Sequence, residues 1–157
     1  MERDVDLIQI RAKELSARAL IRLVDHAVEI AGKRVLVNTR ADVAMVCGAG
    51  GVHLPANSPT APLRSRLGTG FVIGVSCHTI AELQTAERDG ADLAVFGPVF
   101  DSPGKGPAVG IDALREACRS VRMPIYALGG VTEENAPLCV QAGAYGIAGI
   151  RLFSGFE

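Results

Sequence analysis

Short apolar runs alternate with helix-forming segments along this chain, and that alternation restricts its fold more than any other feature. The runs that predict strands lie at residues 7–10, 35–37, 52–54, 72–75, 93–96, 125–128 and 146–150. Strict alternation of strands and helices favours one parallel sheet with right-handed crossovers. We therefore predict a single α/β domain over residues 1–157.

The number of strands separates two architectures. An open doubly wound sheet usually has about five strands, whereas a complete barrel of eight strand–helix units usually needs about 200 residues or more. The chain begins on a strand, and we expect no helix after the last strand. We therefore predict a TIM-type (β/α)8 barrel that lacks its first strand and helix and its last helix. The two exposed edges of such a barrel predict self-association.

Local signals mark the ends of several helices. Ser16 can cap a helix that ends at Gly32, and Thr79 with Glu82 has the spacing of a capping box. Ser58-Pro59 predicts an N-cap followed by a first-turn proline.

Composition excludes several classes of partner. The net charge is −1 without a basic block, aromatic residues make up 4% and Trp is absent, which argues against nucleic-acid binding. Four scattered cysteines favour buried thiols in a reducing compartment over disulfides or a zinc site. The charged start is unlike a signal peptide, and no apolar run is long enough for a membrane span. We expect a cytoplasmic protein that binds neither nucleic acid nor membrane.

Residues 125–150 carry the clearest functional signal. An apolar run meets Gly129-Gly130, and Thr132 with two following glutamates predicts that a helix opens there at once. Glycines after a strand let backbone N–H groups approach an anion without interference from a Cβ atom. The loops after the last two strands of a barrel frequently form a phosphate site. This segment therefore predicts a phosphorylated small-molecule ligand.

Motifs typical of one family cover residues 6–153 in order and with natural spacing. They read IQIRAKELS, VLVNTRADVA, GVHLP, IGVSCHTIAEL, GADLAVFGPVF, ALGGVTEENA and AGAYGIAGI. Together they resemble the thiamine phosphate synthase/TenI family, nearer to its TenI branch. The resemblance implies a phosphate-binding barrel of thiamine biosynthesis. The synthase joins hydroxymethylpyrimidine diphosphate to thiazole phosphate, with Mg²⁺ assisting the departure of diphosphate, and some TenI members tautomerise the thiazole phosphate.

The first strand supplies part of the substrate cradle that the resemblance implies. Gln9, Arg11 and Lys13 alternate along it and so are expected to point to one side of the sheet. Two cations there suit a diphosphate group. A solvated strand end is the alternative interpretation of these residues.

Other positions match the family residue by residue. The match around the pyrimidine diphosphate comprises Asn38, Ser76 and Lys105. The match around the thiazole phosphate comprises Gly129, Gly130, Ile150 and Arg151. Lys105 lies in a Gly/Pro-rich loop that could close over the phosphates. Ordinary solvated side chains are the alternative for Lys105 and Arg151.

Two departures concern the metal. The family pattern has an Asp directly after the asparagine and a second Asp in the loop after GVHL, and this chain has Thr39 and Ser58 there. Mg²⁺ in such sites is held by one or two carboxylates together with substrate phosphates. Asp42 and Asp101 are the nearest acidic substitutes. The resemblance implies Mg²⁺ as a cofactor, but these positions lack its usual ligands, so no metal ligand is predicted.

A third departure concerns the base of the tautomerase, a histidine whose position is Pro98 here. His53 and His78 stand near strand ends and could carry protons, since imidazole titrates near neutrality. A histidine bonded to nearby backbone is the alternative for both. Lys105 and His78 are the candidate catalytic residues.

Three functions stay open. The first is a thiamine-pathway protein that binds a phosphorylated thiazole or pyrimidine, with synthase or tautomerase activity. The second is a non-catalytic or regulatory relative that keeps the cradle. The third is another phosphate-binding barrel enzyme, such as a relative of indole-glycerol phosphate synthase, for which only Lys13 of the required early carboxylate/lysine set is present.

Overall fold

The fold is built on one parallel sheet whose strands lie side by side in the order of the sequence. The computed structural model describes residues 5–104 and 106–154. Within them the sheet contains β1 (Ile8–Ile10), β2 (Val35–Asn38), β3 (Gly51–Leu54), β4 (Val72–Cys77), β5 (Leu93–Phe96), β6 (Ile125–Leu128) and β7 (Gly146–Ala148). A doubly wound sheet would reverse its strand order at a switch point. Sequential order confirms the prediction of an incomplete barrel.

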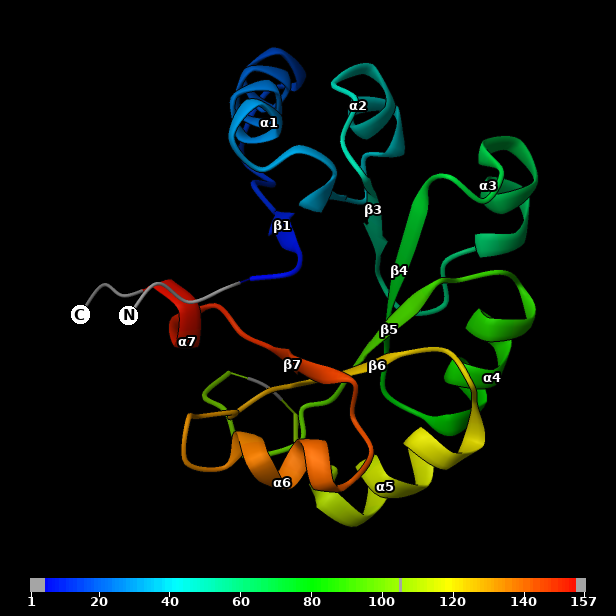
Figure 1. Ribbon diagram of the computed structural model, residues 1–157, viewed down its shortest axis with the longest axis vertical. Coiled ribbons are helices and arrows are strands. Elements are labelled where there is room, and N and C mark those ends of the chain that lie inside the picture. The colour runs from blue at the N-terminus through cyan, green and yellow to red at the C-terminus, as the bar shows by residue number, and fades with distance from the viewer. Residues whose placement is uncertain (1–4, 105, 155–157) are drawn as a thin grey trace.

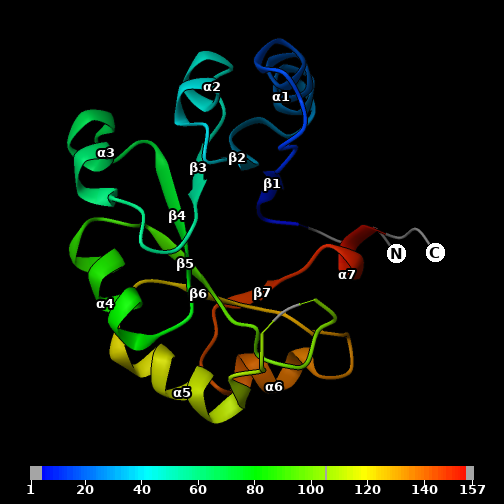
Figure 2. The same cartoon turned by 180° about the vertical axis from the view of Figure 1, so that it is seen from behind.

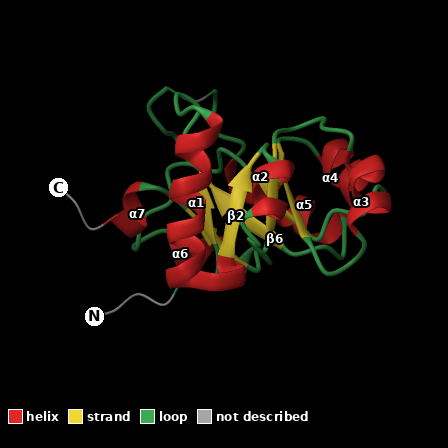
Figure 3. Ribbon diagram, turned by 90° about the horizontal axis from the view of Figure 1, so that it is seen from above, coloured by secondary structure: helices red, strands yellow, loops and turns green. Residues whose placement is uncertain are grey.

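Helices follow the strands and cover one face of the sheet. They are α1 (Ala17–Ala31), α2 (Ala41–Val46), α3 (Thr60–Leu67), α4 (Ile80–Arg88), α5 (Gly110–Ser120), α6 (Ala136–Gln141) and α7 (Arg151–Ser154), with a 3-10 turn, η1 (Gly32–Arg34), before β2. Figure 1 shows α1 to α6 around the outside of a curved sheet. Figures 1 and 2 agree that α7 lies on the open side, near β1. Figure 3 shows the strands inside the layer of helices.

The predicted caps of α1 and α4 are confirmed. The Ser16 hydroxyl accepts a hydrogen bond from the Ala19 N–H, and α1 ends at Gly32 with φ +59°. Thr79 and Glu82 form a reciprocal capping box at α4. Both signals are local in sequence, so neighbouring strands do not alter them.

Three boundaries differ from the sequence predictions. Helix α3 begins at Thr60 with Pro59 as its N-cap, because the Ser58 hydroxyl donates to the Pro55 carbonyl instead. Helix α6 begins at Ala136, because the Asn135 side chain accepts from the Thr132 N–H and holds residues 132–135 in a turn. A single helical turn, α7, follows β7 where no helix was expected.

The two faces of the sheet differ in chemistry. Side chains on the outer face pack against the helices in two apolar clusters, one around Val35 and Val37 beneath α1 and α2, the other around Ile73 beneath α4 and α5. The inner face carries polar side chains near the carboxyl ends of β1 to β4. Because burying a polar group without a partner is costly, that inner face is where a ligand site is expected.

The open side of the barrel carries the two edge strands. In the described part of the chain β1 pairs only with β2, and β7 pairs only with β6. An apolar groove of about 430 Å³ lies between α6, β7 and α7, with Val140, Ile147 and Phe153 in its wall. Self-association through these edges stays a prediction. No helix among the described residues has the length and apolar character of a membrane span.

Candidate functional site

Four polar side chains form a band across the carboxyl ends of the first four strands. Gln9 Nε2 donates to Asn38 Oδ1 at 2.9 Å. His53 Nε2 lies 2.9 Å from Ser76 Oγ. Asn38 and His53 are register partners on β2 and β3, so the two pairs are neighbours. The fold therefore brings together three of the predicted ligand residues and adds His53 between them.

His53 is the buried member of this polar band. His53 is only 5% exposed, and this burial lowers the pKa of the imidazole from its ordinary 6.5 to about 4. Gly74 on the neighbouring strand makes room for the ring, because a Cβ there would lie 3.1 Å from Nδ1 and 2.9 Å from the Leu93 side chain. The imidazole is therefore neutral at physiological pH.

Neutral hydroxyls occupy both positions at which the family pattern has aspartate. The Thr39 hydroxyl donates to the Asn38 carbonyl at 2.7 Å, and the Ser58 hydroxyl donates to the Pro55 carbonyl at 2.7 Å. Thr39 also has φ +60°, an unusual conformation for a β-branched residue. Neither residue offers a negative charge to a cation.

The nearby carboxylates do not replace them. Arg40 donates to both oxygens of Asp42, at 2.8 and 2.6 Å, and this pairing lowers the pKa of Asp42 to about 2. Asp101 is exposed in the loop after β5. No group of three or more His, Cys, Asp or Glu side chains within the described ranges could hold a metal ion. The residues at the expected metal positions do not fit Mg²⁺.

Glycines dominate the loops after β5 and β6. Val99 N–H donates to the Leu128 carbonyl at 2.8 Å, and Phe100 N–H donates to the Gly129 carbonyl at 3.0 Å. Gly129 and Gly130 have φ +94° and +62°, and a Cβ on them would lie 2.5 Å from Pro98 Cα and from the Asp101 carbonyl oxygen respectively. Only glycine permits two loops to pack this closely.

The same turn leaves backbone donors available. Within the described part of the chain, the N–H groups of Gly130 and Val131 donate to no other group. Asn135 Nδ2 donates to the Gly130 carbonyl at 3.0 Å and fixes the orientation of that peptide. Consecutive free N–H groups form a concavity suited to an anion.

His78 joins the loop after β4 to the end of β5. Its Nδ1 lies 2.5 Å from the Gly97 carbonyl oxygen, so Nδ1–H is the donor. The His78 backbone N–H donates to Glu82 at 2.6 Å. The ring is thereby held at Gly97, the residue directly before Pro98, where the resemblance places the base of the tautomerase.

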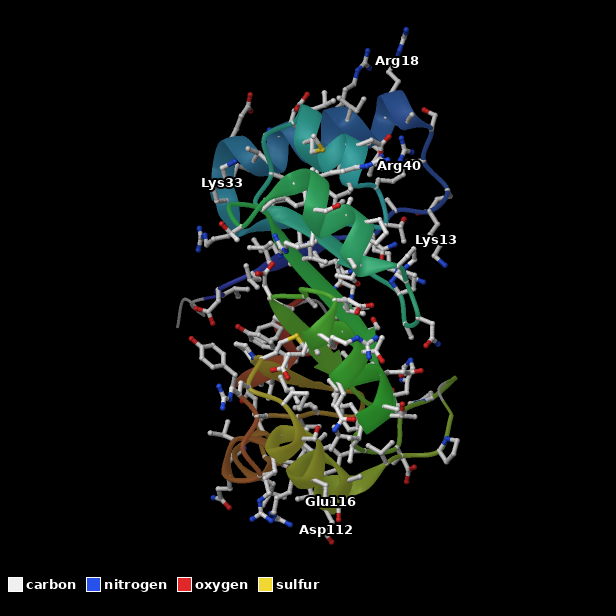
Figure 4. The ribbon with its side chains drawn as sticks, turned by 90° about the vertical axis from the view of Figure 1, so that its right-hand side faces the viewer. Lys13, Arg18, Lys33, Arg40, Asp112 and Glu116 are labelled. Carbon is white, nitrogen blue, oxygen red and sulfur yellow. The ribbon has the colours of Figure 1, made fainter. Side chains whose placement is uncertain are left out.

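The predicted cations stand apart from the polar band. Strand β1 ends at Ile10, so the predicted alternation through Arg11 and Lys13 is wrong; both are exposed in the following loop and turn. Figure 4 shows Lys13 at the carboxyl edge of the sheet and Lys33 at the opposite edge. Lys13 therefore lies at the carboxyl edge of the sheet, as predicted, although strand β1 ends before it.

Three other predicted residues belong to loops or to the chain end. Lys105 lies outside the described residues, as does the side chain of Arg151, the first residue of α7. Ile150 is 85% exposed.

The sequence analysis did not predict that His53 contacts Ser76. A signal existed, because His53 and Ser76 each lie near the end of their strand and β3 is followed by β4 in the sheet. The register of β3 against β4 pairs His53 with Gly74, two positions before Ser76. This register brings the His53 and Ser76 side chains into contact. That register is not visible in either motif alone.

Comparisons with known proteins agree on one family. The family model described as thiamine monophosphate synthase matches residues 1–153. The thiamine-phosphate synthase of Methanocella arvoryzae is 42% identical over 150 residues, covering 91% of this chain and 71% of that protein. The thiamine-phosphate synthase of Methanoculleus marisnigri is 39% identical over 157 residues, covering 96% and 74%.

Solved structures give the same result. The thiamine phosphate pyrophosphorylase from Pyrococcus furiosus has a TM-score of 0.87 and 29% identity, covering 97% of this chain and 76% of that chain. The thiamine phosphate pyrophosphorylase from Bacteroides thetaiotaomicron, at 22% identity and a TM-score of 0.71, shows the shared fold.

Proposed function

Since this chain belongs to the thiamine monophosphate synthase family, we propose that it binds thiazole phosphate and hydroxymethylpyrimidine diphosphate at the carboxyl edge of its sheet. Proteins of this family act in thiamine biosynthesis and bind phosphorylated thiamine precursors. The proposal assigns the two ligands to two parts of the edge. The polar band takes the uncharged ring of the pyrimidine diphosphate, and the glycine turn takes the phosphate of thiazole phosphate.

The polar band suits a heteroaromatic ring. Gln9, Asn38 and Ser76 offer amide and hydroxyl groups, which donate and accept hydrogen bonds without charge. Gln9 and Asn38 are already bonded to each other, so little side-chain entropy is lost when a ligand binds. Lys13, on the same edge, supplies a cation for a diphosphate that extends outward.

The glycine turn suits the phosphate. The N–H groups of Gly130 and Val131 have no other acceptor in the described part of the chain. Backbone N–H groups cradle phosphate oxygens at short range where no Cβ intervenes. The proposal adds Gly129, Ile150 and Arg151 to this phosphate site, as the family resemblance implies.

We assign no Mg²⁺-dependent release of diphosphate to this chain. The observation that supports this is the pair of neutral hydroxyls, Thr39 and Ser58, each turned to a backbone carbonyl. Departure of diphosphate develops negative charge that a carboxylate-held Mg²⁺ would stabilise. The function is therefore binding of the precursors, as in a non-catalytic or regulatory relative.

A second candidate function is favoured by His78. Its Nδ1 donates to the carbonyl of Gly97, the residue directly before Pro98, and this bond fixes the orientation of the ring. Such a base could take a proton from one atom of thiazole phosphate and return it to another, which is the TenI-type tautomerisation. His78→Gln would abolish that activity and leave thiazole phosphate binding unchanged, whereas activity retained in the variant would exclude His78 as the base.

The experiment that tests the leading proposal measures product and binding together. Purified protein is mixed with both precursors and Mg²⁺, and thiamine phosphate is quantified; calorimetry measures the affinity for thiazole phosphate. We expect binding without product. Product at the rate of a synthase from a relative would contradict the proposal.

A matched variant isolates the metal. Thr39→Asp with Ser58→Asp places carboxylates at both positions, and we expect Mg²⁺ binding together with Mg²⁺-dependent product. The control variant is Thr69→Asp, which adds a carboxylate in an exposed loop away from this edge. A double variant that binds no Mg²⁺ would show that residues 39 and 58 do not face one metal site.

A further inference from the structure

We propose that His53 is a positioning residue for the ligand: its Nε2–H donates to Ser76 Oγ and so directs the serine hydroxyl proton toward the bound ring. The inference rests on the proposed function, because it deepens the role of the polar band. It concerns a residue that contacts Ser76 rather than the ligand. The ligand group that Ser76 would meet is a hydrogen-bond acceptor, such as a ring nitrogen.

The His53 and Ser76 side chains lie in hydrogen-bonding geometry. His53 Nε2 and Ser76 Oγ are 2.9 Å apart, which is a well-formed hydrogen bond. The two residues come from neighbouring strands whose register is fixed by four paired positions from Gly51 to Leu54. A rigid parallel ladder therefore sets the relation of the imidazole to the hydroxyl.

The proposal concerns one of the two neutral tautomers of the ring. Among residues 5–104 and 106–154, Nδ1 has no hydrogen-bond partner, and it lies against Gly74. The Ser76 hydroxyl can accept from a protonated Nε2 or donate to a bare one, so the 2.9 Å contact fits both neutral tautomers. The proposal assigns the proton to Nε2, which makes Ser76 Oγ the acceptor.

The direction of the serine hydroxyl follows from that assignment. An oxygen that accepts from Nε2–H turns its own O–H away from the imidazole. The Asn38–His53 register places the other polar residues of the band on the same face, and we expect the freed hydrogen to point toward the ligand ring proposed to lie there. Burial also keeps the imidazole neutral, so the arrangement persists across the neutral pH range.

A double-mutant cycle tests the coupling. Calorimetric titrations with hydroxymethylpyrimidine diphosphate are run on the wild type, Ser76→Ala, His53→Ala and the double variant. Loss of one hydrogen bond raises Kd about threefold to tenfold, and we expect this for each single variant. The double variant should bind no more weakly than either single one. His53→Gln retains an N–H donor near the Nε2 position and should recover most of the affinity.

A spectroscopic measurement keeps the test independent of variant folding. Nitrogen-15 NMR of the wild type should show a protonated Nε2 and a bare Nδ1 for His53, and Ser76→Ala should shift the Nε2 signal. The matched control is His26→Ala, since His26 is exposed on α1. That substitution should leave both the affinity and the His53 signals unchanged.

The outcomes separate this inference from the proposed function. A wild type that binds neither precursor contradicts both. If the wild type binds and His53→Ala binds equally tightly, or the two losses add in full, only the positioning role fails. A bare Nε2 in the wild type would also overturn it.

Discussion

The carboxyl edge of this barrel has two halves that present hydrogen-bonding groups in different ways. On β1 to β4 the groups are side chains, Gln9 bonded to Asn38 and His53 bonded to Ser76. After β6 they are the backbone N–H groups of Gly130 and Val131, in a turn where Gly129 and Gly130 bring two loops into close contact. The first half suits an uncharged ring and the second half suits an anion. In the proposed function, the first half takes the pyrimidine ring and the second half takes the thiazole phosphate.

The two halves also respond differently to mutation. A side chain of the polar band can be replaced with the loss of one or two hydrogen bonds. A glycine of the turn cannot be replaced without moving a neighbouring backbone. Substitutions of the turn glycines should therefore lower the unfolding free energy more than substitutions of side chains in the polar band.

The largest effect is expected for Gly130→Ala. A Cβ there would lie 2.5 Å from the Asp101 carbonyl oxygen, and φ is +62°. Overpacking and a left-handed conformation each cost about 1–3 kcal/mol, so we expect a loss of about 3 kcal/mol of unfolding free energy, measured in urea.

Gly68→Ala is the matched control for that substitution. Gly68 has φ +67° with nothing within 4 Å of the added Cβ, so only the backbone conformation is tested. We expect a loss of about 1 kcal/mol. Equal losses in the two variants would show that close loop packing does not distinguish the glycine half.

The buried imidazole of the side-chain half predicts a pH effect. The pKa of His53 is lowered from 6.5 to about 4 in the folded chain, so the unfolded chain binds more protons between these values. The contribution of neutral His53 to the unfolding free energy is fully present above pH 6.5. It is lost as the pH falls toward 4, and the loss is about 3 kcal/mol.

His53→Gln removes that titration. Its unfolding free energy, compared with the wild type at pH 7 and pH 4.5, should fall less on acidification. Identical pH dependence in the two proteins would mean that His53 titrates normally in the folded state, contrary to its burial.

A smaller change, an increase in the unfolding free energy, is expected for a substitution at Thr39. Its φ of +60° is poorly tolerated by β-branched residues, whereas Asp adopts this region more readily. Thr39→Asp should therefore raise the unfolding free energy by about 0.5–1 kcal/mol, and Thr69→Asp should change it little. Destabilisation by Thr39→Asp would argue against strain at this residue.

The fold was largely predictable because its signals are local. Alternating runs gave all the described strands, and the Thr79–Glu82 spacing gave the cap of α4. The start of α6 was not predictable, since Asn135 bonds to Thr132 and Gly130 and competes with a helix there. Lys13 was placed on a strand that ends at Ile10, because alternation alone cannot show where pairing stops.

The site was predictable only in part. Gly129-Gly130 stands out in the sequence, but its cause, contact with Pro98 and Asp101, depends on two loops meeting in space. Asn38 and Ser76 followed from the family resemblance. The role of His53 depends on strand register, which a single motif does not contain.

Binding of the ligand without a metal is the central claim, and calorimetry with thiazole phosphate in the presence of EDTA tests it most directly. We predict saturable binding of one ligand per chain that is unchanged when Mg²⁺ replaces EDTA. Absence of binding in EDTA that Mg²⁺ restores would contradict the account, because it would require a metal site that Thr39 and Ser58 do not provide.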